Sequence, residues 1–160
     1  MQIRTGLGYD VHRLKTGETL ILGGVPVSHH KGTVAHSDGD VLLHAISDAL
    51  LGAAALKDIG YHFPDTDAEF KNANSMELLQ KCYELVKNKG WKIGNIDATL
   101  AMQTPKLKPY IDQMCINIAQ HLDLPVDAVS VKATTTEKLG FVGREEGVEA
   151  LATILIIKDL

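Results

Sequence analysis

Cysteine, basic clusters and long apolar runs are all scarce in this sequence, and each shortage excludes a class of protein. The 160 residues include two cysteines, Cys82 and Cys115, at apolar positions of expected helices, so we interpret them as buried, unreactive thiols in a reducing compartment. The longest apolar stretches, "DALLGAAAL" and "LATILII", are too short to span a bilayer. No run of five basic residues occurs and the net charge is −4, which argues against nucleic-acid binding by bulk electrostatics.

The overall composition indicates an ordinary globular protein. Hydrophobic residues make up 45% and charged residues 22% of the chain, which is not typical of disorder. No repeat or linker divides the sequence, so residues 1–160 are expected to form a single domain. The first residues lack the basic and apolar regions of a secretory signal, and the expected location is the cytoplasm.

Hydrophobic periodicity predicts strands and helices along the chain. The N-cap of the first helix is expected at Ser37 or Asp38, and the capping-box pattern Asn74-x-x-Glu77 begins the second helix. Turn residues without periodicity predict a long loop over 57–74. The expected strands are 2–12, 20–22, 25–27, 95–103, 128–135 and 148–158, and the expected helices are 37–56, 75–90 and 109–122.

The last expected strand, "VEALATILIIK", is apolar almost throughout. Such a run indicates burial on both faces of a sheet. Helices can cover one face, and a neighbouring subunit is the simplest cover for the other.

The first strand contains the motif "GYDVH". Because side chains of a strand alternate between its two faces, Asp10 and His12 point to the same side. The pair suits two ligands that converge on one ion, and it equally suits a polar strand face.

The first helix carries a second group of short polar residues. Asp40, His44, Ser47 and Asp48 fall within a stripe about 100° wide on an otherwise apolar helix. A solvated stripe usually contains Lys, Glu, Arg or Gln, and this one contains none. Asp40 and Asp48 each lie four residues from His44, where a carboxylate can orient an imidazole.

Asp10, His12 and His44 together form a ligand set that suits zinc. Zn²⁺ accepts histidine nitrogen and carboxylate oxygen, and three protein ligands leave the open position of a catalytic site. The spacing matches no standard short zinc motif. A plain polar surface therefore stays an alternative at this stage.

Three further polar segments could contact a phosphorylated ligand. "HSDGD", with His36, precedes the first helix, and free backbone N–H groups at a helix N-terminus bind anions. "KATTTEKLGFVGREEG" contains hydroxyls, cations and a carboxylate suited to Mg²⁺ or Mn²⁺. "QTPKLKP" places free backbone groups at a strand end. Each segment could also be an ordinary polar loop.

Three of these stretches, taken in order, resemble one enzyme family. "GYDVH", "AHSDGDVLLHAISDALLGAAALKDIGYHFPDTD" and "VKATTTEKLGFVGREEG" are similar to motifs of the 2-C-methyl-D-erythritol 2,4-cyclodiphosphate synthases of the non-mevalonate isoprenoid pathway. The resemblance runs nearly end to end. It implies an α+β fold of two layers, in which a mixed β-sheet is packed by helices on one face and its other face is buried in a homotrimer with active sites between subunits. It also allows a processed plastid form, which would act in the stroma.

The resemblance also implies roles for individual residues, taken motif by motif. The implied metal ligands are Asp10, His12 and His44 for Zn²⁺ and Glu137 for a second ion, Mg²⁺ or Mn²⁺. His36 and Thr135 are implied to act beside the zinc on the substrate phosphates. Substrate contacts are implied for Ser37, Asp58, Ile59, Gly60, Phe63 and Asp65. Nucleotide contacts are implied for Met102, Pro105, Lys106, Leu107, Thr134, Thr135 and Thr136. Phe141 and Arg144 match the lining of an axial channel that can hold an isoprenoid diphosphate.

The implied reaction is an intramolecular phosphoryl transfer that releases CMP from a cytidyl diphosphate substrate. Two alternatives use part of the same residues. A metal-dependent phosphohydrolase would use a zinc-bound water and release inorganic phosphate. A trimeric protein that only binds isoprenoid diphosphates would need the axial channel but not Glu137.

Overall fold

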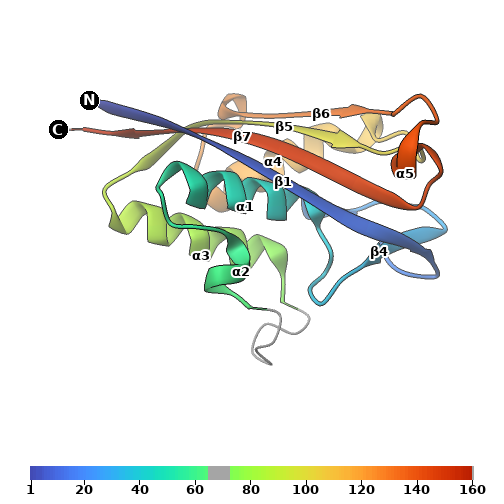
Figure 1. Cartoon of the computed structure of the whole chain (residues 1–160). Helices are drawn as coiled ribbons and strands as arrows, with labels where there is room; N and C mark the ends of the chain where they lie inside the picture. The colour runs from blue at the N-terminus through green and yellow to red at the C-terminus, as the bar shows by residue number, and fades with distance from the viewer. Residues whose placement is uncertain (65–72, 160) are drawn as a thin grey trace.

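One five-stranded mixed sheet forms the frame of the protein (Figure 1). A computed structural model describes residues 1–64 and 73–159. The strand order is β4-β1-β7-β5-β6, with β5 and β6 parallel and the other neighbours antiparallel. The strands are β1 (Gln2–Thr16), β4 (Lys31–Val34), β5 (Lys92–Ala101), β6 (Val129–Thr134) and β7 (Gly147–Lys158). The predicted α+β fold with a mixed sheet is confirmed.

Most predicted elements are present, and several differ from the prediction. Strand β4, the 3-10 turn η3 and the short helix α5 were not predicted, and β1 continues to Thr16 instead of ending at residue 12. The predicted loop over 57–74 contains a short helix, α2, and the predicted helix over 109–122 begins with the separate 3-10 turn η2. The helices are α1 (Val41–Ala53), α2 (Ile59–His62), α3 (Ser75–Asn88), α4 (Ile111–Leu122) and α5 (Gly140–Gly143). The other elements are the two-stranded pair β2 (Ile21–Leu22) and β3 (Val25–Pro26), with the 3-10 turns η2 (Lys108–Tyr110) and η3 (Val126–Ala128).

Helices α1, α3 and α4 lie on one face of the sheet, as predicted (Figure 1). Helix α1 packs against β1 and β7, α3 packs against α1, and α4 packs against β6. On the opposite face, Leu7 is 68% exposed and Tyr9 is 51% exposed. Alternate residues of β7 are buried, and Leu151 between them is exposed. Within the described part of the chain, β7 is therefore buried on one face, and a subunit over the other face stays a prediction.

Two glycines of β1 allow the strand to lie directly on helix α1. A Cβ atom on Gly8 would lie 1.9 Å from the carbonyl oxygen of Ala45, and one on Gly6 would lie 1.9 Å from that of Ala49. No side chain fits there, so the strand backbone and the helix backbone touch. This contact brings the next residues of β1 on the same face within reach of α1.

Helix α1 begins later than predicted. Its N-cap is Asp40, not Ser37 or Asp38, because the Asp40 carboxylate accepts the N–H of Leu43. The same carboxylate accepts the N–H groups of Gly23 and Gly24, at 3.0 and 2.7 Å. Burial raises the pKa of Asp40 to about 6, although its three backbone hydrogen bonds act in the opposite direction.

The substitution Asp40→Ala should therefore be strongly destabilising. It removes a helix cap and leaves two N–H groups between β2 and β3 without their acceptor, so we expect a loss of about 3–5 kcal/mol in the free energy of unfolding. Urea denaturation of the metal-free protein measures it. The control is Asn74→Ala, which removes a single cap bond to Met76 and should lose about 1 kcal/mol. Equal losses in the two variants would contradict a triple role for Asp40.

Both cysteines are free, as predicted. Cys82 is buried, and burial raises the pKa of its thiol to about 12. Cys115 is only half-buried, which differs from the prediction that both thiols are buried, and burial raises its pKa as well. Thiols with raised pKa values are poor nucleophiles at neutral pH, which agrees with unreactive core residues. In the described residues, no helix has the length and apolar character needed to cross a membrane.

Candidate active site

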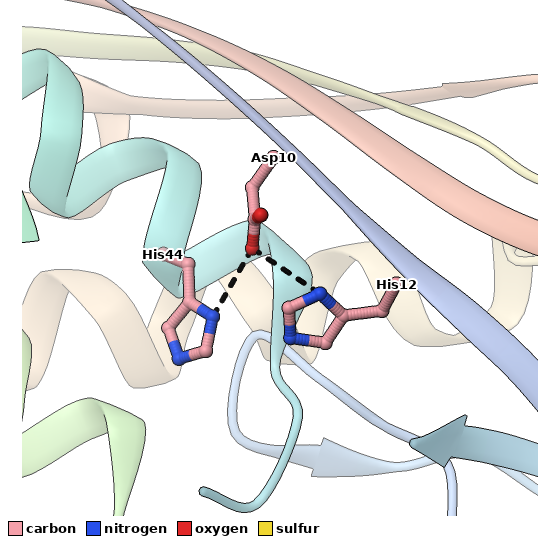
Figure 2. Close-up of side chains that lie close together, drawn as sticks. All are labelled: Asp10, His12 and His44. Atoms are coloured by element: carbon pink, nitrogen blue, oxygen red, sulfur yellow. Dashed lines mark hydrogen bonds and ion pairs between the residues drawn. The ribbon is translucent and has the colours of Figure 1, made fainter. Parts of the chain in front are cut away.

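Asp10 and His12 from β1 meet His44 from α1 (Figure 2). The Oδ2 atom of Asp10 lies 3.1 Å from Nδ1 of His44 and 3.4 Å from Nδ1 of His12. One possible ligand atom from each residue lies within 4.8 Å of the other two. The strand period and the close approach of β1 to α1 thus bring together the three residues that the sequence predicted as a metal set.

The local contacts leave His12 suited to a further ligand. Its Nδ1 atom lies 2.8 Å from the carbonyl oxygen of Val11, while its Nε2 atom is buried and has no hydrogen-bond partner among the described residues. A buried imidazole nitrogen without a partner is costly unless something occupies it. The two nitrogen donors and one carboxylate fit a zinc ion, which binds this mixed set.

Several acidic groups surround the cluster. Burial lowers the pKa of His44, but the hydrogen bond to Asp10 and the charges of Asp10, Asp40 and Asp38 outweigh that effect, so the pKa is raised above its usual value. Burial also raises the pKa of Asp48. The cluster is thus a partly buried, electronegative site that favours a cation.

The prediction that Asp40 and Asp48 orient the His44 ring is wrong. The carboxylate of Asp40 is used by backbone N–H groups, and Oδ1 of Asp48 accepts the N–H of Ile59 at 2.8 Å. Both acids instead attach other segments to α1, namely the β2–β3 pair and the start of α2. The groups that lie at Nε2 of His44 are the hydroxyls of Ser75, at 2.9 Å, and Ser37, at 3.3 Å.

A cavity of about 330 Å³ opens beside the cluster. It brings together most of the residues predicted to contact substrate. Its lining includes Asp10, His12, His36, Ser37, His44, Asp48, Ile59, Gly60 and Phe63. Asp58 is not among the described lining residues, although it directly precedes α2, and Asp65 lies outside the described residues.

A second cavity, of about 480 Å³, lies where β5 and β6 end. Six of the seven predicted nucleotide contacts line it, namely Met102, Pro105, Lys106, Leu107, Thr134 and Thr135. Thr136 is not among the described lining residues, and its hydroxyl donates to the carbonyl of Leu139. Leu107, Met102 and Ile111 supply an apolar wall, and Thr134 and Thr135 supply hydroxyls at its edge.

Glu137 lies in the turn that follows this second cavity. Glu137 and Lys138 have φ values of 53° and 65°, a left-handed conformation that costs a non-glycine residue about 1–2 kcal/mol. The hydroxyl of Thr135 donates to Oε1 of Glu137 at 3.2 Å, and Gln103 accepts the N–H of Lys138. Strain of this kind is often found at functional sites. Among the described residues, Glu137 is not part of the Asp10–His12–His44 group.

Phe141 and Arg144 line a third cleft, of about 690 Å³, which shares His12 with the first cavity. The guanidinium of Arg144 is paired with Glu146 at 3.0 Å. Lys31 and Arg13 also line this cleft, so both cationic and anionic groups face it.

Sequence reasoning missed Ser75 as a contact of His44 and Asp38 as the hydrogen-bond partner of Ser75. Ser75 is separated from His44 by 31 positions and looked like an ordinary first residue of a capped helix. Its small polar side chain next to the Asn74 cap is the one local signal, and nothing in the sequence says which histidine it would meet.

Comparison with known proteins gives a consistent result. The model of the YgbB family matches residues 3–157 of this chain. A protein of Pseudomonas syringae pv. syringae named 2-C-methyl-D-erythritol 2,4-cyclodiphosphate synthase is 58% identical over 156 residues, which cover 98% of this chain and 99% of the relative. A Salinibacter ruber protein of the same name is 60% identical over 154 residues, 96% of this chain and 98% of the relative.

Solved structures share the fold. The bifunctional IspDF of Campylobacter jejuni superposes with a TM-score of 0.93 at 51% identity over 97% of this chain, which spans 42% of that longer protein. A CDP complex of IspF from Plasmodium falciparum superposes with a TM-score of 0.87 at 37% identity, over 99% of this chain and 97% of that one.

Proposed function

This chain belongs to the YgbB family, and from that premise we propose that it cyclises 4-diphosphocytidyl-2-C-methyl-D-erythritol 2-phosphate to 2-C-methyl-D-erythritol 2,4-cyclodiphosphate, with release of CMP. Two relatives that this chain matches almost end to end are named for that product. The observation that carries the proposal is the Asp10–His12–His44 cluster at the wall of a cavity that also contains His36 and Ser37. This reaction is one step of the non-mevalonate route to isopentenyl diphosphate.

The chemistry requires no nucleophile from the protein. An oxygen of the 2-phosphate bonds to the β-phosphorus, the bond from that phosphorus to the oxygen bridging toward the α-phosphate breaks, and CMP leaves with that oxygen. Because both reacting groups belong to one molecule, the enzyme has to fold the substrate and stabilise the charge that moves to the leaving phosphate. This agrees with a site rich in histidine, serine and threonine.

We propose Asp10, His12 and His44 as the ligands of one Zn²⁺ ion. The buried Nε2 atom of His12, which lacks a partner among the described residues, and the acidic groups around His44 support a cation there. When bound, zinc supplies a Lewis acid for a phosphate oxygen. His36 and Ser37 then hold the phosphates at the cavity wall, and α2 with Ile59, Gly60 and Phe63 contacts the methylerythritol part. Asp58 and Asp65 belong to the same proposed substrate segment.

We propose the cavity at the ends of β5 and β6 as the cytidine site. Its apolar wall suits a pyrimidine ring, and Thr134 and Thr135 at its edge offer hydroxyls to the nucleotide phosphates. Thr136, the next residue, is proposed as a further contact of the nucleotide. Glu137, held in a strained turn beside Thr135, would carry Mg²⁺ or Mn²⁺. Two cations allow a protein of net charge −4 to bind a multiply charged anion.

The active form is proposed to be a homotrimer of single-domain subunits, each spanning residues 1–160, with active sites between subunits. The exposed apolar residues Leu7, Tyr9 and Leu151 on the outer sheet face support an interface there. Among the described residues, the metal cavity and the nucleotide cavity share no lining residue, which is expected if one substrate bridges two chains. Phe141 and Arg144 are proposed to face an axial channel that accepts an isoprenoid diphosphate. The free thiols favour the reducing cytoplasm, or the stroma for a plastid form.

The test is ³¹P NMR of the purified protein with the cytidyl substrate and Mg²⁺, before and after zinc is removed and restored. We expect stoichiometric CMP and cyclic diphosphate, lost with zinc and recovered on its return. Release of inorganic phosphate without the cyclic product would instead identify a phosphohydrolase. Bound zinc without turnover would leave a binding protein.

A further inference from the structure

Two residues outside the metal set form a hydrogen-bonded chain behind His44. Nε2 of His44 lies 2.9 Å from the hydroxyl of Ser75, the first residue of α3, whose side chain is almost fully buried. That hydroxyl donates to Oδ1 of Asp38, and the N–H of Ser75 donates to Oδ2 of Asp38 at 3.0 Å. The start of α3 and the loop before α1 therefore meet beside one imidazole.

The hydrogen bonds that link Asp38, Ser75 and His44 can run in only one direction. A carboxylate can only accept hydrogen bonds, so the Ser75 hydroxyl donates its proton to the hydrogen bond with Asp38. The oxygen of Ser75 then has a lone pair for His44, and Nε2 of His44 must be the protonated nitrogen. The Ser37 oxygen, 3.3 Å from Nε2, accepts the N–H of Gly39 and fits the same arrangement.

This assignment leaves Nδ1 of His44 with its lone pair directed at Asp10. In the neutral ring, Nδ1 and the carboxylate oxygen Oδ2, 3.1 Å apart, are both acceptors. Either a second proton on the ring, which gives the hydrogen bond to Asp10 described above, or a cation between the two atoms relieves this arrangement. The opposite holds for His12. Its Nδ1–H donates to the carbonyl of Val11, and its buried Nε2 atom keeps a free lone pair. The two rings therefore offer different nitrogens to the ion.

From this geometry we infer that Asp38 and Ser75 are positioning residues for metal binding, which hold His44 in the tautomer that presents Nδ1. The inference rests on the zinc site of the proposed function. Partners of this kind orient a ligand ring, and their loss typically weakens metal binding about 10–100-fold.

The variants Ser75→Ala and Asp38→Asn test the inference through zinc affinity, measured by competition with a chromogenic chelator. Ser75→Ala should weaken zinc binding about 10–100-fold. Asp38→Asn should weaken it at least as much, because the amide oxygen must still accept the N–H of Ser75 and the amide N–H₂ is then directed at the Ser75 oxygen. The Ser75 proton is then free to turn toward Nε2, which favours the tautomer that does not present Nδ1.

The matched control is Ser47→Ala, which removes another buried hydroxyl of the same region. Ser47 donates to the carbonyl of Leu43, and none of its described hydrogen bonds involves His44, so its zinc affinity should stay within about twofold of the parent protein. Thermal unfolding of the metal-free variants verifies that all three fold. Unchanged zinc affinity in folded Ser75→Ala and Asp38→Asn would overturn the inference.

An imidazole ¹⁵N–¹H correlation spectrum of the zinc-loaded protein reads the tautomers directly and needs no substrate. We expect the proton of His44 on Nε2 and that of His12 on Nδ1. A His44 proton on Nδ1 would overturn the inference even if cyclisation proceeds. The expected tautomers with zinc bound but no cyclisation would support the inference and count against the proposed function instead.

Discussion

His12→Ala should lose stoichiometric zinc and lower kcat for cyclisation by at least about 10³-fold. A metal ion typically contributes several kcal/mol to stabilising charge in the transition state, and each 1.4 kcal/mol corresponds to about a tenfold rate change. His12 is the most informative of the three proposed ligands, because its Nε2 atom has no other partner in the described part of the chain. Its loss therefore removes a ligand without breaking another described hydrogen bond of that atom.

The measurement combines metal analysis by mass spectrometry with the ³¹P NMR assay. His121→Ala is the matched control, because His121 lies exposed in the last turn of α4 and outside the three cavities described above. The control should retain zinc and activity. If His12→Ala still bound one zinc per chain and turned over at the parent rate, the proposed metal site would be wrong.

Mixed trimers of His12→Ala and Glu137→Ala subunits should recover activity that neither variant has alone. His12 lines the metal cavity and Glu137 follows the nucleotide cavity, so each variant keeps one intact half of a site. In a ring of three subunits of two kinds, one interface in three joins an intact metal half to an intact nucleotide half in the right order. Trimers that contain both kinds should thus show about one third of the parent activity, whichever kind is in the majority.

The experiment requires two affinity tags and sequential purification, so that only trimers containing both variants are assayed. The control pairs His12→Ala with Asp10→Ala, two defects in the same half, which should recover nothing. If each site lay within one chain, every subunit of the first mixture would carry a defect and the mixture would be as inactive as the control. That outcome would refute a site between subunits.

The sequence correctly predicted those features of the structure that depend only on residues close together in the chain. The two-residue period of a strand placed Asp10 and His12 on one face, and both face α1. Asn74 caps α3 as predicted, because the cap acceptor and the N–H of Met76 that it satisfies are two residues apart. The ligand set, the fold class and most residues of the two proposed substrate cavities were thus within reach of the sequence and its family resemblance.

The sequence could not predict which hydrogen-bond partner each buried carboxylate would take when several partners come from distant parts of the chain. Asp40 and Asp48 lie one helical turn from His44, and spacing alone predicted that they would orient its ring. In the structure their carboxylates accept N–H groups of Gly23, Gly24 and Ile59, which the fold delivers from elsewhere. A buried N–H without an acceptor is costly, so these amides determine what each carboxylate does.

The sequence by itself determined which ligand types are present at the site, because metal binding depends on the donor atoms of the side chains. The period of a strand or helix also predicted which nearby residues share a face. Only the tertiary structure decided which of them meet. The close contact of Gly6 and Gly8 with α1 brings β1 to His44, and the start of α3 brings Ser75 to the far side of the same ring. Side chains that are 31 to 34 positions apart come into contact through packing of whole elements, and no local pattern encodes which partner each will find.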